Sequence, residues 1–360
     1  MGERVTIRDV AARAGVSVAT VSRVLAGNYP TSTASRAKVL RAVKDLDYVA
    51  NAHARALAGA GRKTIAVLMY DVVGAFYAQV AQGVEMEAAQ HGRLTLVSST
   101  GSDPARELAL VQMMREQAAE AVVLVGGVTQ DDEYRQRMAR YAEVLAAAGS
   151  RLVLCGRPAP APDVPALVVE YDNEAGAHAV TSHLLGAGHR RIALLGYQPG
   201  NTTGEDRLAG YLRALADHGV PRADAVLHGV GFGQNHGYRA MRDLLDAADG
   251  KPEFTAVFAG DDRAAAAAVI ALREYGLRVP EDMSVVGYND DPVAGDITPG
   301  LTTVHIPAEE MGRTAVRRAL SGASGTGQER HVLGTHIVIR HSVRPLRGGS
   351  AAAGAGGALD

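Results

Sequence analysis

Residues 6 to 25 constrain this chain most, because they contain two short amphipathic segments joined at one glycine. Thr6, followed three residues later by Asp9, is typical of a helix N-terminus. Gly15 predicts the end of that helix, since glycine tolerates a left-handed backbone. Ser17 predicts the N-cap of a second helix. The pattern favours a helix-turn-helix, although two amphipathic helices around a glycine also occur in many other folds.

The apolar residues of this region recur at helical spacing, so each expected helix has an inward face. The inward positions are Ile7, Val10, Ala11 and Ala14 in the first helix and Val21, Val24 and Leu25 in the second. Val18, Ala19, Ser22 and Arg23 are expected to face outward. A third helix is expected from Ser32, with Val39, Leu40, Val43 and Leu46 as its apolar stripe.

The residue identities carry a more specific signal than this pattern. Val5–Leu25 closely resembles the N-terminal DNA-binding domain of the LacI/GalR family of bacterial transcription regulators. Residues 35–39 and 46–51 continue the resemblance, and residues 52–59 are similar to the hinge helix of that family. Matching segments recur along the rest of the chain, at Asp172–Gly176, His183–Ala193, Ser284–Asp290, Leu301–Val304 and Met311–Ala315.

The resemblance implies both a fold and a function. The expected fold is an all-α helix-turn-helix head joined to an α/β body similar to a periplasmic binding protein, with two doubly wound parallel-sheet lobes. The expected function is sequence-specific transcriptional repression. The chain would bind double-stranded operator DNA of near-palindromic sequence as a homodimer. A small-molecule effector, a sugar or related polyol, would bind in the cleft between the lobes, and no cofactor is implied.

Charge is unevenly distributed along the chain. Residues 1–63 contain eleven Lys and Arg against four Asp and Glu, a charge of +7, whereas the remainder carries −9. A basic segment that coincides with the expected helix-turn-helix favours a DNA-binding head on a sensor body. A random fluctuation of charge explains that coincidence less well.

Length and composition narrow the class of protein. A chain of 360 residues with 47% hydrophobic residues suggests two or three units with sizeable cores. No run of 18 apolar residues appears, so no membrane span is expected, and the N-terminus lacks an apolar signal-peptide core. A single cysteine, Cys155, excludes an intrachain disulfide and suits a reducing cytoplasm. We therefore expect a cytoplasmic protein associated with the nucleoid.

From Thr64 onward, short apolar runs alternate with amphipathic stretches, which favours parallel sheets covered by helices on both faces. The expected strands are Thr64–Tyr70, Leu94–Ser98, Ala121–Val125, Arg151–Cys155, Leu167–Tyr171, Arg191–Gly196, Thr255–Gly260 and Met283–Tyr288. The expected helices are Tyr77–His91, Ala105–Ala118, Asp131–Ala148, Glu174–Leu185, Asp206–His218, Gly237–Ala247 and Asp262–Tyr275.

The resemblance also implies domain boundaries. The helix-turn-helix domain covers residues 1–47 and the hinge with its minor-groove helix covers 48–62. The N-terminal effector-binding lobe combines 64–170 with 306–333, and the C-terminal lobe combines 171–305 with 334–346. Residues 347–360 form a Gly- and Ala-rich tail with little to bury, which predicts disorder.

The expected second helix presents little hydrogen-bonding capacity to DNA at its tip. Val18 and Ala19 cannot donate, so thymine-methyl contact or shape fit is their expected role, whereas Arg23 can form a bidentate pair with guanine. A phosphate contact is the alternative for Arg23. Further DNA contacts, mostly to phosphate, are expected from Thr6, Ser17, Thr20, Ser22, Ser32, Ser35, Tyr48, Asn51 and Ala54; several of the hydroxyls also suit helix capping.

Leu57 lies in an alanine-rich hinge segment that is too short to be a stable helix by itself in water. In the family this hinge folds on DNA and wedges leucines into the minor groove. Such wedging unstacks a base step and kinks the duplex. The alternative is that Leu57 is a core residue of an ordinary linker helix.

Arg207 matches a family position that hydrogen-bonds ligand hydroxyls; the alternative is a surface ion pair with Asp206 or Glu205. Asp261 and Asn289 each follow an expected parallel strand, where ligands bind in open α/β sheets. Many relatives carry the amide first and the carboxylate second, so the effector's identity does not transfer. Asp71, Phe76, Tyr77 and Phe232 complete the expected effector site, with lobe packing as the alternative for Phe76 and Tyr77.

The sequence disfavours two other classes of protein. An enzyme is disfavoured because the chain lacks a Gly-x-Gly-x-x-Gly turn after a strand, a P-loop, a nucleophile elbow and a His/Cys cluster with metal-ligand spacing. No metal site is therefore expected. A transport-associated sugar-binding protein fits the body but not the basic head.

Replacing Leu57 tests the expected hinge directly. Leu57→Ala should weaken specific operator binding strongly, because the wedge that holds the kinked base step is lost, while effector binding stays intact. Gel-shift titrations of both proteins on the same operator measure the change. Unchanged operator affinity would contradict the wedge.

Overall fold

The computed structural model describes residues 5–26, 31–48, 64–229, 231–321 and 328–346. The expected hinge residues Asn51, Ala54 and Leu57 and the expected tail lie outside the described residues. The chain divides into two compact units, Met1–Lys63 with Gly92–Leu94 and Thr64–His91 with Thr95–Asp360. Each unit is described by itself below.

The head consists of α1 (Ile7–Ala14), α2 (Val18–Ala26) and α3 (Thr33–Asp45). Thr6 caps α1, and its backbone N–H and hydroxyl both donate to the Asp9 carboxylate at 2.7 Å. These bonds lower the pKa of Asp9, the hydroxyl bond contributing most. Gly15 ends α1 at φ 66°, in the left-handed region that the sequence predicted.

The head has its own small core, formed by Val10, Ala11, Ala14, Val21, Val24, Val39 and Ala42. The expected outward residues Val18, Ala19, Ser22 and Arg23 are exposed. Leu40 was predicted to face inward, and this prediction was wrong: it is 49% exposed. The buried face of α3 passes through Val39 and Ala42, three positions apart, which turns Leu40 toward solvent.

A six-stranded sheet of order β11-β5-β4-β3-β1-β2 forms the first lobe of the body. Its strands are β1 (Thr64–Met69), β2 (Leu94–Ser99), β3 (Ala121–Val125), β4 (Arg151–Cys155), β5 (Leu167–Tyr171) and β11 (Glu329–Leu333). The pairs β1/β3, β3/β4, β4/β5 and β5/β11 are parallel, with Ile65 opposite Ala121 and Leu167 opposite Glu329. The predicted bounds of β3, β4 and β5 are confirmed to the residue.

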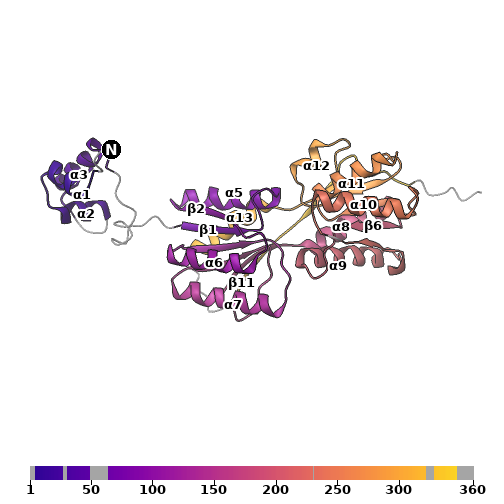
Figure 1. The fold of residues 1–360 in the computed structure, drawn as a ribbon, viewed down its shortest axis with the longest axis horizontal. Helices are drawn as coiled ribbons and strands as arrows, with labels where there is room; N and C mark the ends of the chain where they lie inside the picture. Colours follow the sequence, from indigo (N-terminus) through magenta and orange to yellow (C-terminus); the bar gives the residue numbers. More distant parts are fainter. Residues whose placement is uncertain (1–4, 27–30, 49–63, 230, 322–327, 347–360) are drawn as a thin grey trace, which may run out of the picture. The chain divides into compact units, whose positions relative to one another are not determined.

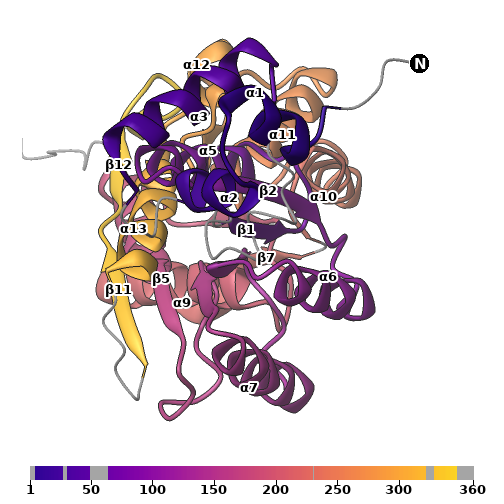
Figure 2. The same ribbon diagram turned by 90° about the vertical axis from the view of Figure 1, so that its left-hand side faces the viewer.

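Both faces of this sheet are covered by helices (Figures 1 and 2). Ile65 and Val67 pack with α5 (Ala75–Gln90) and α13 (Ala308–Leu320) on one face. Ala66 and Leu68 pack with α6 (Pro104–Glu116) and α7 (Asp132–Ala147) on the other. Burial on two sides explains why these strands are almost continuously apolar.

The second lobe has a parallel sheet of order β7-β6-β8-β9. Its strands are β6 (Ile192–Leu195), β7 (Val226–His228), β8 (Ala256–Ala259) and β9 (Ser284–Val286). Leu194 and Phe258 face α8 (Asn173–Gly186) and α9 (Thr202–Asp217), whereas Leu195 and Val257 face α10 (Gln234–Ala247) and α11 (Asp262–Glu274). The short helices η1 (Arg222–Asp224) and α12 (Pro292–Asp296) lie in connections. The predicted fold class of the body is confirmed.

The two lobes of the body touch directly. The chain crosses between them after β5, after β10 (Thr303–His305) and before β12 (His336–Val338), and the last two strands pair antiparallel. A further contact, which we call the latch, joins Val128 to Thr202: the Thr202 N–H donates to the Val128 carbonyl at 2.9 Å. The Val128 N–H donates back to the Thr202 hydroxyl at 3.1 Å. The latch therefore fixes the first turn of α9 against the first lobe.

None of the described helices is long and apolar enough to cross a membrane.

The crossing of α5 and α13 depends on two glycines. A Cβ atom on Gly83 would lie 1.9 Å from the Glu309 carbonyl oxygen, and one on Gly312 would lie 2.2 Å from the Val80 carbonyl oxygen. The helix backbones are therefore in contact, and no side chain fits between them.

Gly312→Ala should lower the free energy of unfolding by about 1–3 kcal/mol, the usual cost of overpacking. Gly186→Ala is the matched control, because a Cβ atom there meets nothing within 4 Å. Urea unfolding of the two variants and the parent measures the difference. Equal stability of the two variants would show that the helices separate at no cost.

Candidate functional site

Arg207 is the centre of a buried polar cluster in the body. It lies in the second turn of α9 and is only 4% exposed. Its Nε donates to Asn173 Oδ1 at 3.0 Å, and its Nη1 donates to the Gly260 carbonyl oxygen. Its Nη2 donates to the Tyr171 hydroxyl at 3.3 Å and to Asn289 Oδ1 at 3.1 Å. Every acceptor in this set is uncharged.

Two aromatic rings flank the Arg207 guanidinium. Its central carbon lies 3.8 Å from the centre of the Tyr288 ring and 5.7 Å from that of Phe232. Such contacts are worth about 2 kcal/mol when they are desolvated. The alternative, a surface ion pair with Asp206 or Glu205, is wrong for this structure: the guanidinium is buried, and its hydrogen bonds go to Asn173, Gly260, Tyr171 and Asn289.

Asn289 reaches Arg207 from an unusual backbone conformation. Its φ of 107° lies where glycine is favoured, and its N–H donates to the Val304 carbonyl at 2.9 Å. Asp261 was expected beside it as a second polar group. Both of its carboxylate oxygens accept backbone N–H groups, from Ala264 at 2.7 Å and from Gly233 at 2.6 Å. Asp261 therefore caps α11 and anchors the loop that carries Phe232.

Two further buried carboxyl groups follow the strand ends. Burial raises the pKa of Asp262 to about 8, and hydrogen bonds from Thr303 and from the Asp291 N–H oppose that rise. Burial also raises the pKa of Asp291 to about 6, with the Asp261 charge as the next cause. One oxygen of Asp291 has no partner among the described residues.

Of the three residues expected from the first lobe, only Phe76 contacts a member of the Arg207 cluster through a ring contact that the structure shows. The Phe76 ring lies 5.9 Å from Tyr171, which in turn bonds Arg207, so Phe76 belongs to its outer wall. Tyr77 contacts Phe76 edge-on at 5.4 Å, and burial raises its pKa to about 12. Asp71 instead closes a turn before α5 by accepting from the Val73 and Gly74 N–H groups.

Sequence reasoning missed three members of the cluster, Tyr171, Asn173 and Tyr288. Tyr171 ends β5, Asn173 begins α8, and Tyr288 follows β9, where its hydroxyl donates to the Asn173 carbonyl at 3.0 Å. The position at the carboxyl end of a parallel strand, which singled out Asp261 and Asn289, applies equally to both tyrosines. That signal was available for them.

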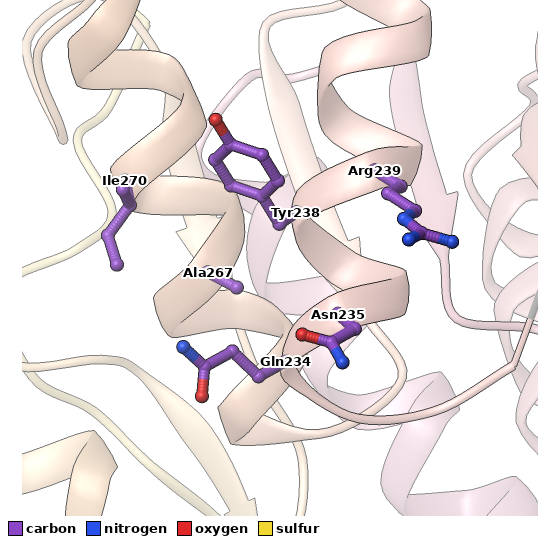
Figure 3. A pocket seen from close by; sticks show the side chains of 6 residues that line it. All are labelled: Gln234, Asn235, Tyr238, Arg239, Ala267 and Ile270. Carbon is purple, nitrogen blue, oxygen red and sulfur yellow. The ribbon is translucent and has the colours of Figure 1, made fainter.

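An open pocket of about 450 Å³ lies elsewhere, on the surface between α10 and α11 (Figure 3). It is lined by Gln234, Asn235, Tyr238, Arg239, Ala267 and Ile270. None of these residues belongs to the Arg207 cluster. We therefore base the site on the convergence of polar and aromatic groups at Arg207 and not on this pocket.

In the head, several hydroxyls expected on DNA are paired with one another. Ser17 accepts from the Thr20 N–H at 3.1 Å, and the two hydroxyls lie 2.9 Å apart. Ser32 caps α3 and donates to the Ser35 hydroxyl at 2.9 Å. Tyr48 is half-buried against the head core. Ser17 and Ser32 thus act as helix caps in the described head, and Thr20 and Ser35 are their partners.

Comparison with known proteins now identifies the chain. Residues 6–51 match the model of bacterial regulatory proteins of the lacI family, and residues 181–343 match a periplasmic binding protein-like domain. The transcriptional regulator CelR of Thermobifida fusca is 36% identical over 94% of this chain and 98% of its own. The chain belongs to the LacI family.

Two solved structures extend the likeness. A CelR–cellobiose complex is 33% identical, covers 94% of this chain and 100% of its own, and has a TM-score of 0.67. The lac repressor dimer bound to operator and an anti-inducer is 26% identical, covers 95% of this chain and 100% of its own, and has a TM-score of 0.80. This LacI-family chain is a DNA-binding transcriptional regulator and not an enzyme. In the described part of the chain, no group of three His, Cys, Asp or Glu residues could hold a metal ion.

Proposed function

We propose that this regulator is a cytoplasmic, nucleoid-associated repressor that binds a near-palindromic operator as a homodimer. A small-molecule effector, a sugar or related polyol, binds around Arg207 and changes operator affinity. The buried guanidinium with only uncharged acceptors is the observation that carries this proposal. The lobes that hold the effector are residues 64–170 with 306–333 and residues 171–305 with 334–346.

The chemistry of the cluster suits a polyhydroxylated ligand. The bonds from Arg207 to Asn173 and Gly260 fix the plane of the guanidinium, whereas its Nη2 bonds to Tyr171 and Asn289 are exchangeable for ligand hydroxyls. Phe232 supplies an apolar wall. The solved CelR relative holds cellobiose, which supports a sugar for this chain.

Helix α9 provides a physical route from effector to lobe arrangement. Its first residue, Thr202, forms the latch to Val128, and Arg207 lies five residues further along the same helix. A ligand that binds Arg207 therefore contacts α9, a helix of the second lobe that is also hydrogen-bonded to the first lobe. Coupling arises if the ligand binds the latched and unlatched arrangements with different affinity.

The head supplies the DNA-reading surface. Arg23 is exposed on α2 and is the residue we assign to guanine, with Val18 and Ala19 in apolar contact. Phosphate contacts are also expected from four hydroxyls, those of Ser17, Thr20, Ser32 and Ser35. Each of these hydroxyls must give up a hydrogen bond to its neighbour before it bonds a phosphate, so the net gain in binding free energy is small. The hinge residues Asn51, Ala54 and Leu57 are assigned to the minor groove.

A second copy of the chain is the partner that we assign to the β2 edge of the first sheet. Leu96 and Val97 on this edge strand are 42% and 44% exposed, and Val72 and Val73 after β1 are also exposed. An edge strand with apolar side chains readily pairs with another chain. The lac repressor relative is a dimer on its operator, which supports the same assembly here.

Arg207→Ala should abolish the response to effector while operator affinity without effector stays unchanged. Arg213→Ala, an exposed arginine on the same helix paired with Glu174, is the matched control and should respond normally. The operator is first obtained by sequencing DNA selected by the purified protein, and a thermal-shift panel of sugars supplies the effector. Fluorescent operator titrations with and without that sugar then decide: a normal response from Arg207→Ala would refute the site.

Leu96→Asp should convert the dimer to a monomer and weaken operator binding by at least about tenfold, because one head contacts only a half-site. Leu227→Asp is the control, since Leu227 is 40% exposed on β7, the edge strand of the other sheet. Sedimentation velocity and gel shifts measure both effects. A Leu96→Asp protein that remains dimeric would exclude β2 from the interface.

A further inference from the structure

Asp262 is a fully buried carboxyl group that the proposed site leaves without a role. It begins α11, directly after the residue that caps this helix. Its Oδ1 accepts from the Thr303 hydroxyl at 2.6 Å, and its Oδ2 accepts from the Asp291 N–H at 2.7 Å. Its own N–H donates to the Tyr288 carbonyl at 3.0 Å.

These bonds enclose the segment 287–291 at both ends. A Cβ atom on Gly287 would lie 2.0 Å from Asp262 Oδ1, so the carboxyl group fills space that only glycine leaves open. Within the segment, Tyr288 and Asn289 are the two residues that contact Arg207. Two of the groups around the Arg207 guanidinium, the Tyr288 ring and the Asn289 amide, therefore lie in a segment that Asp262 contacts at both ends.

The segment also needs external support. Asn289 has a φ of 107°, and Asp290 after it has a φ of 60°, both in the region that disfavours side chains. Such a backbone persists only where its surroundings over-determine it. Asp262 supplies bonds before and after these two residues, and Thr303 fixes the carboxyl group itself.

Thr303 connects this arrangement to the rest of the body. It begins β10, and the chain passes from β10 into α13 of the first lobe. The Gly287 N–H donates to the carbonyl of the preceding residue, Thr302, at 3.0 Å. The Asn289 N–H donates to the Val304 carbonyl within β10 at 2.9 Å. Two backbone bonds therefore join the segment that contacts Arg207 to β10 and to the residue before it.

We infer that Asp262 is a positioning residue for the effector: together with Thr303 it holds Tyr288 and Asn289 against Arg207 and links their position to the crossing strand β10. The inference rests on the proposed function, because it assigns Asp262 to the same site. If Asp262 only filled space in the core, its role would depend on the shape of its neighbours. Removing the Thr303 hydroxyl while keeping the shape of the side chain would then leave the effector response unchanged.

Thr303→Val and Thr303→Ser separate these two roles. Valine keeps the shape and removes the hydroxyl, whereas serine keeps the hydroxyl and removes a methyl group. Full-length proteins are titrated on the operator with a panel of mono- and disaccharides that includes cellobiose. Thr303→Val should bind operator normally but need about five- to tenfold more sugar for half its response, the worth of one hydrogen bond. Thr303→Ser should behave as the parent; the reverse order of the variants would overturn the inference.

Hydrogen exchange gives a second readout that needs no ligand. The amides of residues 287–291 should exchange faster in Thr303→Val than in the parent, and Thr303→Ser should restore the slow rate. Equal rates in the parent and Thr303→Val would overturn the inference whatever the sugar result. If no sugar changes the parent's operator affinity, the proposed sugar response fails, and the exchange rates alone decide the positioning role.

Discussion

The proposed effector site depends on a buried guanidinium, that of Arg207, which has no carboxylate acceptor. Removing a charge from water costs several kcal/mol, and at Arg207 this cost is offset by uncharged acceptors and two aromatic faces. The acceptors come from the ends of different elements, so all of these elements must be in place at once. The cluster therefore forms only when the second sheet, the start of α8 and the end of β5 are correctly arranged. A ligand that rearranges the cluster acts on all of these elements together.

Much of the fold could be predicted because burial on both faces leaves a strong signal in the sequence. The apolar runs at β3, β4 and β5 gave their bounds to the residue. Strands of three residues, such as β10 and β12, carry too few positions for a period to appear. The expected start of α9 at Asp206 is four residues late, because the helix is capped further upstream by Asn201, which accepts from the Thr203 and Gly204 N–H groups.

The site was predictable in position but not in bonding. Parallel strands end at one edge of a sheet. This rule and the family resemblance together predict that Arg207, Phe232 and Asn289 lie close to one another, and the structure places them in one cluster. The rule does not predict that both Asp261 carboxylate oxygens accept backbone N–H groups. A carboxylate at the end of a strand can also be the N-cap of the helix that follows, and Asp261 has that role. The same rule points to Tyr171 and Tyr288 as well, but a tyrosine at a strand end is also typical of a core residue, so the rule alone does not separate the two roles.

Helix α9 shows why effector response and lobe arrangement are difficult to separate in this molecule. Its first turn is bound to the other lobe through Thr202, while its second turn carries Arg207. The two turns are joined by successive backbone hydrogen bonds, so Thr202 and Arg207 belong to one continuous helix. The loop before it is itself braced, by Glu205 accepting from Gly200 and Tyr197. In the proposed mechanism, an effector at the guanidinium and the contact to the other lobe therefore act on the same helix, which couples the two sites if the effector binds the latched and unlatched arrangements with different affinity.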